Sequence, residues 1–168
     1  MLKNIVVFET GATPKIVKRH HSRLMRESFI YAGGRYHARY MALHFTTAGA
    51  AKYGYRPRAG ERSGIGSRAF FRSYTGRKQR EQKHVRPLVW SGVSETLARI
   101  RDVRATKTTG RIVQHARGLN RRNPNSEINM VDEIRSVAAD EAAEVAADFG
   151  GHYVKRLKEI RTRRRLNL

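Results

Sequence analysis

Cysteine is absent from this chain of 168 residues, and long apolar runs are absent too. Without cysteine the protein can form no disulfide and has no thiolate to serve as metal ligand or nucleophile. No apolar run approaches the ~20 residues that a transmembrane helix needs. An acid directly follows the short apolar start Ile5–Phe8, which is not the pattern of a signal peptide. The sequence therefore predicts no membrane partner.

Acidic residues are scarce, with 14 Asp and Glu against 35 Lys and Arg, so the net charge is +21. Self-repulsion at this level opposes a compact free monomer, and a polyanion or an acidic partner would relieve it. The apolar fraction of 39% lies below the average for soluble domains, so we expect a small core. These features are typical of an intracellular protein that works in an assembly or on nucleic acid.

The charge is unevenly distributed along the chain. Residues 52–122 hold nineteen bases and four acids, residues 132–148 hold six acids and one base, and residues 155–165 hold seven bases and one acid. This asymmetry suits a head-to-tail contact between copies, or a nucleic-acid face opposite a protein face. It suits equally well a solvated C-terminal helix whose acids and bases complement the helix dipole.

The N-terminal part predicts a strand followed by helices. Residues 4–9 are rich in residues that favour strands. Thr13 is a good N-cap and Pro14 a favoured first helical residue, so we expect a helix from there until Gly33-Gly34 stop or kink it. A second helical piece is expected over residues 35–44.

The middle of the chain lacks a sustained period. Thr46 or Thr47 could cap a short helical turn that ends at Lys52. The next segment, about residues 53–87, contains five glycines and many arginines. This composition predicts a long basic loop or arm. A helical turn is expected within it near Ser73–Gln82.

The C-terminal half predicts a small sheet and one long helix. Residues 93–103, beginning either as a strand or as a helical turn, and residues 111–115 indicate a hairpin around Thr108-Thr109-Gly110. A loop over 117–129, a strand or helix start over 130–137, and a helix over 138–161 with a kink at Gly150-Gly151 complete the prediction. The expected fold class is therefore α+β in a single domain over residues 1–168, with a small antiparallel sheet, long N-terminal and C-terminal helices, the basic arm, and a basic tail at 161–168.

Residue patterns for catalysis or metal binding are missing. The seven histidines lack the spacing of a helical zinc site, and the clustered acids lie among alanines on the predicted C-terminal helix. Gly64-Ile65-Gly66-Ser67 lacks the Lys-Ser/Thr ending of a phosphate-binding loop. We therefore expect no catalytic, metal or cofactor site and no enzyme activity.

The arm and its surroundings alternate aromatic and basic side chains. The candidate interface anchors are Tyr53, Tyr55, Phe70, Phe71, Tyr74 and Trp90. The candidate contacts to DNA or to an acidic partner are Arg56, Arg58, Arg62, Arg68, Arg72, Arg77, Lys78, Arg80, Arg163, Arg164 and Arg165. Arginine binds phosphate with a bidentate fork and aromatic rings stack on bases, as in the RNA-binding arms of ribosomal proteins. Tyrosine and arginine are also favoured anchors of protein interfaces, and composition does not choose between the two.

The order of short motifs adds a resemblance to a known class. The motifs are His44-Phe45-Thr46, Lys52-Tyr53-Gly54-Tyr55, the single residues Arg58, Tyr74 and Lys78, and then Pro87-Leu88-Val89 and Ser91-Gly92. This order resembles tailed-phage virion-morphogenesis proteins of the neck, head–tail connector and tail-completion class. The resemblance covers about residues 36–104, and the alanine-rich C-terminal helix is compatible with it. One departure is that Val93-Ser94-Glu95 stands where many tail-completion proteins carry a Leu-rich step.

The resemblance implies a structural protein of the virion with no enzyme activity. Such proteins form rings, often six- or twelve-fold, at the head–tail junction around the path of the DNA. The implied partners are further copies of the chain, other neck, portal or tail proteins, and the phage DNA in the channel, with synthesis in the host cytoplasm. The charge alone favours an alternative, a ribosomal or other basic RNA-binding protein.

Overall fold

The computed structural model describes residues 14–62, 64, 66–120 and 128–166, and it confirms the α+β fold class. The elements, including two 3₁₀ helices called η1 and η2, follow in the order α1 Pro14–Tyr40, η1 Met41–Phe45, α2 Thr47–Lys52, α3 Arg68–Arg72, α4 Tyr74–Gln82, α5 Val93–Ala98, β1 Val103–Ala105, β2 Gly110–Ile112, η2 Arg117–Asn120, α6 Met130–Ile134 and α7 Ala139–Leu166. The strand predicted over residues 4–9 lies outside the described residues.

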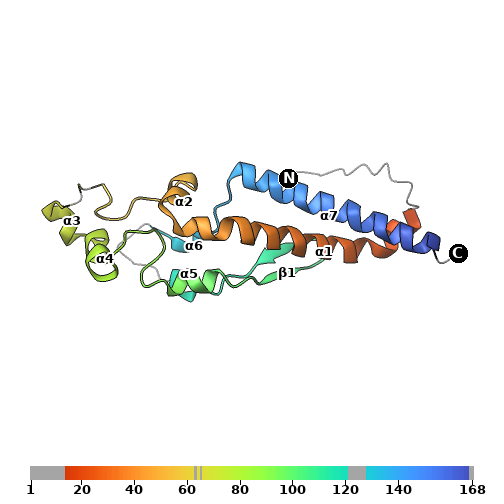
Figure 1. The fold of residues 1–168 in the computed structure, drawn as a ribbon, viewed down its shortest axis with the longest axis horizontal. Helices are drawn as coiled ribbons and strands as arrows, with labels where there is room; N and C mark the ends of the chain where they lie inside the picture. Colours follow the sequence, from red (N-terminus) through yellow and green to blue (C-terminus); the bar gives the residue numbers. More distant parts are fainter. Residues whose placement is uncertain (1–13, 63, 65, 121–127, 167–168) are drawn as a thin grey trace.

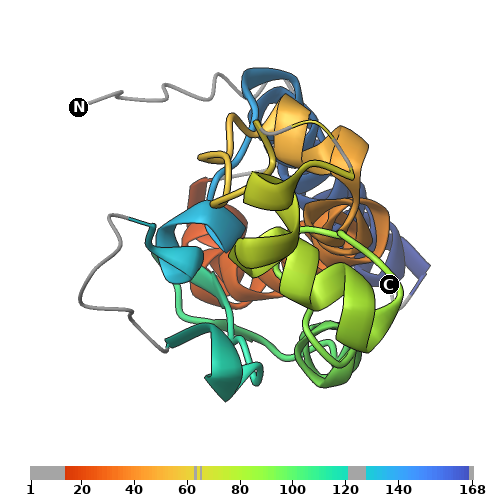
Figure 2. The same cartoon turned by 90° about the vertical axis from the view of Figure 1, so that its left-hand side faces the viewer.

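The described residues form an elongated molecule whose central element is α1 (Figure 1). Helix α7 runs antiparallel beside α1, and the β1–β2 hairpin packs against α1 on the side away from α7. Helices α3 and α4 lie at one end, and Figure 2 looks at the molecule from that end. The basic arm therefore lies at one tip of the molecule, beyond the start of α7.

The predicted break of α1 at Gly33-Gly34 is wrong, because the helix continues through both glycines to Tyr40. The second helical piece is therefore the end of α1 followed by η1. A Cβ atom on Gly33 would lie 2.8 Å from Cγ1 of Val103 in β1. Glycine costs about 1 kcal/mol of helix propensity relative to alanine. Here it lets the hairpin pack directly against the helix.

The predicted hairpin is confirmed, but the sheet is shorter than expected. Val103 pairs with Ile112 and Ala105 with Gly110 in antiparallel register. Residues 93–98 form α5, so the first segment does begin as a helix. Residues 130–134 form the separate helix α6, capped by Asn129 through a 3.1 Å hydrogen bond from the Val131 N–H. Helix α7 passes through Gly150-Gly151 without a break, and the expected kink there stays a prediction.

The arm is folded rather than an open loop. Helix α4 confirms the predicted turn near Ser73–Gln82, whereas α3 was missed. The Ser73 hydroxyl joins the two helices, because it donates to the Phe70 carbonyl at 2.6 Å and accepts from the Gly76 N–H at 3.1 Å. A Cβ atom on Gly76 would lie 2.0 Å from that same carbonyl oxygen. Glycine is therefore required where α4 starts against the end of α3.

Two apolar clusters hold the elements together. The larger cluster consists of Met41, Phe45, Tyr55, Leu88, Val89, Ala98, Ala116, Leu119 and Ile134. The smaller cluster consists of Leu24, Tyr153 and Leu157 between α1 and α7. Tyr55 is the first arm residue inside the larger cluster, so the arm begins within the core of the molecule.

Candidate functional site

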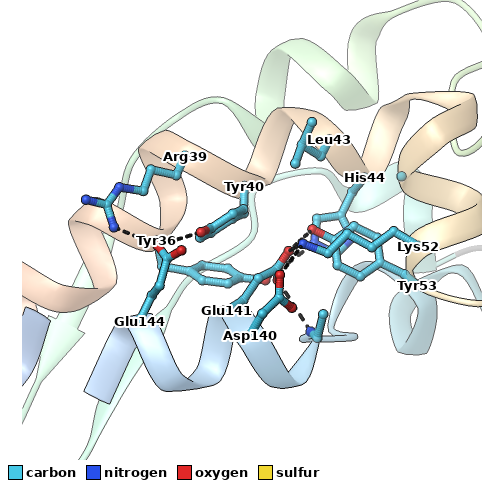
Figure 3. Close-up of polar contacts among 12 residues, drawn as sticks. Tyr36, Arg39, Tyr40, Leu43, His44, Lys52, Tyr53, Asp140, Glu141 and Glu144 are labelled. Carbon is cyan, nitrogen blue, oxygen red and sulfur yellow. Dashed lines mark hydrogen bonds and ion pairs between the residues drawn. The ribbon is translucent and has the colours of Figure 1, made fainter. Parts of the chain in front are cut away.

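The root of the arm is built around a buried carboxylate, Glu141, in the first turn of α7 (Figure 3). Its side chain is fully buried. The Lys52 ammonium at the end of α2 lies 2.7 Å from its Oε1 atom, and the Tyr53 hydroxyl donates to the same atom at 2.7 Å. The Ala138 N–H lies 3.4 Å from the other carboxylate oxygen. Three groups from two segments thus satisfy one buried charge.

The ion pair stays charged because its hydrogen bonds outweigh its burial. Burial works to raise the pKa of Glu141, but hydrogen bonds from Lys52 and Tyr53 bring that pKa below its usual value. Hydrogen bonds to Glu141 and Asp140 hold the pKa of Lys52 well above its usual value. Glu141 is the buried partner of this pair, whereas Lys52 is partly exposed and also pairs with Asp140 at 3.0 Å. Losing the pair would therefore be costly mainly at Glu141, whose carboxylate would be left buried with fewer hydrogen-bond partners.

His44 lies beside this pair and is also fully buried. Its ring stacks on Tyr53, with centroids 4.0 Å apart and planes 2° apart. Its Nδ1 atom lies 2.5 Å from the Tyr55 hydroxyl and its Nε2 atom 3.5 Å from the Tyr36 hydroxyl. Burial lowers the pKa of His44 to about 4, so the ring is neutral at physiological pH. Both ring nitrogens are occupied by tyrosines, which suits a positioning role.

Acidic residues of α7 also pair with bases of α1. Arg39 contacts Glu144 at 3.0 Å and the Tyr40 hydroxyl donates to Glu144 at 2.6 Å (Figure 3). Arg39 also contacts Asp148 at 3.1 Å. This hydrogen bond, with burial acting in the same direction, raises the pKa of Tyr40 to about 12. The row of charged contacts fastens the start of α7 to the end of α1.

A second ion pair, with both side chains almost fully shielded from solvent, joins the arm to α6. Arg58 forms a bidentate ion pair with Glu133 of α6, whose Oε1 lies 2.8 Å from one guanidinium nitrogen. The Arg56 N–H donates to the same carboxylate at 3.2 Å. Lys78 is buried and donates to the Arg86 carbonyl. Burial, assisted by the charge of Arg58, lowers the pKa of Lys78 to about 8.

The predicted anchors separate into inward and outward groups. Tyr55 and Phe70 are buried, and Tyr53 is half-buried in the network around Glu141. Phe71 and Tyr74 are 43% and 46% exposed. Trp90 is half-buried, with the Tyr74 ring 5.4 Å from it and the Arg77 guanidinium 5.0 Å over it.

The predicted cationic contacts separate in the same way. Arg58 and Lys78 are turned inward, while Arg77 is exposed and pairs with Glu81 at 3.0 Å. Arg56 is exposed and has a partner, and the side chains of residues 163–165 lie outside what the structure describes. The remaining predicted contacts, together with Lys83, are exposed and form no ion pair with any described residue. We call them the arm-tip cations, and they are Arg62, Arg68, Arg72, Arg80 and Lys83.

Comparison with protein-family models, with curated proteins and with solved structures found no match to this chain. Within the described residues no group of three or more His, Cys, Asp or Glu side chains could hold a metal ion. None of the described helices is long and apolar enough to cross a membrane. The site must therefore be interpreted from its own geometry.

Two residues central to the site, Glu133 and Glu141, were not among the sequence candidates. Both lie in an acidic stretch with the pattern of a solvated helix surface. Neither spacing nor composition separates them from their exposed neighbours, because their partners are far away in the chain: Arg58 lies 75 positions before Glu133 and Tyr53 lies 88 positions before Glu141. The one available signal was the charge asymmetry, which indicated that this stretch meets bases somewhere.

The arrangement is suited to recognition. Buried charges and tyrosines at the root hold the arm in place, and exposed arginines and aromatic rings are gathered at its end. A rigid base with an uncovered, strongly basic tip is suited to contacts with another macromolecule.

Proposed function

We propose that this chain is a structural virion protein of a tailed bacteriophage, forming a ring at the head–tail junction as a neck, connector or tail-completion component. The observation that carries the proposal is the convergence of the motif residues. Lys52 and Tyr53 bind Glu141, and His44 stacks on Tyr53. Arg58 pairs with Glu133. Residues of the motif order thus build the two ion-pair sites at the root of the arm, and this structural role of the motifs supports the resemblance on which the proposal rests.

In this role the arm is the contact element between subunits or with other neck, portal or tail proteins. Phe71 and Tyr74 are large, exposed and next to unpaired arginines, which is the composition of interface anchors. A six- or twelve-fold ring gives every arm an equivalent neighbour. The protein would be made in the host cytoplasm and end in the virion.

A non-catalytic role is supported by how the titratable groups are used. His44, Glu141 and Lys52 have shifted pKa values, yet each is occupied by partners within the network. Perturbed pKa values of this kind also arise in structural ion-pair networks. We therefore propose no enzyme activity and no cofactor.

The alternative, a ribosomal or other basic RNA-binding protein, is favoured by the same arm tip, because unpaired arginines beside exposed aromatic rings also suit RNA. The two proposals place the chain in different particles. A ribosomal protein sediments with ribosomal subunits, and a connector protein sediments with phage particles.

The test is to produce phage particles from cells carrying the gene in its own phage genome, purify them on a density gradient, and identify the chain by mass spectrometry. We expect several copies per particle, and we expect deletion of the gene to yield DNA-filled heads separate from tails. Presence with ribosomal subunits and absence from particles would overturn the proposal in favour of the alternative.

A further inference from the structure

The acidic residues of the stretch 132–148 make contacts within the protomer. Of the six acids in residues 132–148, Glu133 pairs with Arg58 and both Asp140 and Glu141 pair with Lys52. The other three are occupied as well, since Arg39 binds Glu144 and Asp148, and Asp132 accepts from the Asn129 side chain at 2.5 Å. Five of these six carboxylates thus have a basic partner within the protomer, so most of the negative charge of the stretch is already compensated by this chain.

The arm-tip cations remain without an acidic partner in the part of the chain that the structure describes. Arg68 and Arg72 are four residues apart on α3, so they lie on one helix face. Arg80 lies in the last turn of α4, and Lys83 directly follows that helix. Cations that are spread along two helices and a loop, instead of converging on one point, match a polyanion whose charges repeat along its length.

We infer that the arm tip binds the phosphate backbone of double-stranded DNA without regard to its sequence. Duplex DNA carries a negative charge about every 1.7 Å of its axis, and each neutralised phosphate releases condensed counterions. Arginine forks fit phosphate oxygens bidentately. The inference deepens the proposed function and rests on it for the choice of DNA over RNA.

The test measures binding of the full-length chain to a 30-base-pair duplex of arbitrary sequence across a range of salt concentrations. The arm variant is Arg68→Gln/Arg72→Gln/Arg80→Gln. The matched control is Lys18→Gln/Arg19→Gln/Arg26→Gln, three exposed α1 residues that also form no ion pair with the described residues. Both variants lower the net charge by three, so only the position of the lost charge differs between them.

For the unchanged chain we expect binding that weakens steeply with salt and is equal for unrelated sequences. The arm variant should reduce the slope of log K against log salt by about two to three and weaken binding by roughly 10-fold or more at about 0.1 M salt, because each lost phosphate contact removes about 0.9 from the slope. The control variant should change the salt slope and the affinity much less. Circular dichroism should show both variants folded, and Arg62→Gln/Lys83→Gln serves as a second arm variant if the first unfolds.

Four results would overturn the inference. The first is no binding of the duplex at low salt, and the second is an equal loss of DNA affinity in the arm and control variants. The third is binding of polyglutamate that is as tight as that of DNA and is weakened as much by the arm variant. The fourth is a strong preference for duplex RNA of the same sequence. The third would indicate an acidic protein partner and the fourth the RNA-binding alternative. Failure here leaves the location of the chain in particles untouched, so the two proposals can fail separately.

Discussion

Glu141 is the residue on which the arm's position depends most directly. It is fully buried, and Lys52 and Tyr53 both bind one of its oxygens. Glu144 lies three positions further along α7 and also has a basic partner, but its side chain is 51% exposed. Burial is therefore the main difference between two otherwise similar ion-paired glutamates.

Glu141→Gln should lower the free energy of unfolding by about 2–3 kcal/mol, because it replaces a fully buried carboxylate that accepts charge-assisted hydrogen bonds from Lys52 and Tyr53 with a neutral amide. Glu144→Gln should cost less than about 1 kcal/mol, because an exposed ion pair contributes little. Urea unfolding of both variants measures the difference. Equal losses would contradict the assignment of Glu141 as the anchor.

His44 should make the protein sensitive to mild acid. Its pKa is about 4 in the folded chain against a usual 6.5, because burial disfavours the imidazolium. Above pH 6.5 the imidazole of His44 is neutral in both the folded and the unfolded chain, so it adds no pH dependence to the free energy of unfolding. Between pH 6.5 and pH 4 the imidazole takes up a proton in the unfolded chain but not in the folded chain, so the free energy of unfolding falls, by about 3 kcal/mol in all. Below pH 4 this loss levels off.

The measurement is the free energy of unfolding of the unchanged chain and of His44→Gln at several pH values from 7.5 to 4. The variant should be less stable at neutral pH and should show a shallower fall between pH 6.5 and pH 4. Parallel pH profiles would show that another group causes the acid sensitivity.

Among the helices, the two glycine pairs look alike in sequence but differ in their surroundings. Gly33 of α1 faces Val103, whereas Gly151 of α7 has no other group within 4 Å of a built Cβ atom. Gly151→Ala should therefore stabilise the protein by about 1 kcal/mol through helix propensity. Gly33→Ala should destabilise it by about 1 kcal/mol or more, because stiff Val103 must move. Thermal unfolding of the two variants should give shifts of opposite sign; shifts in the same direction would contradict the packing of β1 on α1.

Elements with local signals were predictable from the sequence. Thr46 before a short helix, Ser73 before α4, and the turn between β1 and β2 all act through neighbouring residues, and each was expected. The continuous path of α1 through Gly33-Gly34 was not, because the reason for glycine there is a strand about 70 positions later. Helix α3 was missed because its cap, Ser67, follows a glycine-rich stretch without apolar periodicity.

The candidate site was only partly predictable for the same reason. Tyr55, Phe70 and Trp90 were recognised as anchors by residue type, but the sequence left open whether the partner was this chain or another. The structure places Tyr55 and Phe70 in the protomer's own interior and leaves Phe71 outside. Burial of one phenylalanine and exposure of the next depends on how α3 lies on α4, which residue type does not reveal.

Phe70 and Phe71 should therefore separate folding from assembly. Phe70→Ala should cost about 3–4 kcal/mol, because Phe70 is only 2% exposed. Phe71→Ala should cost less than about 1 kcal/mol and leave the helicity unchanged, but it should reduce incorporation into particles. Circular dichroism and the copy number in purified particles measure the two effects. Full incorporation of Phe71→Ala would contradict its role as an interface anchor.

For the whole molecule, the net charge of +21 is only partly compensated by ion pairs within the protomer. Five of the six acids in residues 132–148 pair with bases of the protomer, whereas the arm-tip cations have no acidic partner among the described residues. A head-to-tail contact between copies would therefore need apolar or hydrogen-bonding complementarity at the arm. An assembly with a polyanion within reach is the setting that best accommodates this surface.

The most direct test of the account is to image the native particle by cryo-electron microscopy and locate this chain. The account predicts a closed ring of equivalent copies at the head–tail junction, with α3 and α4 of each copy ordered against a neighbouring chain or the DNA. A single copy, a two-fold dimer, or a position away from that junction would contradict it.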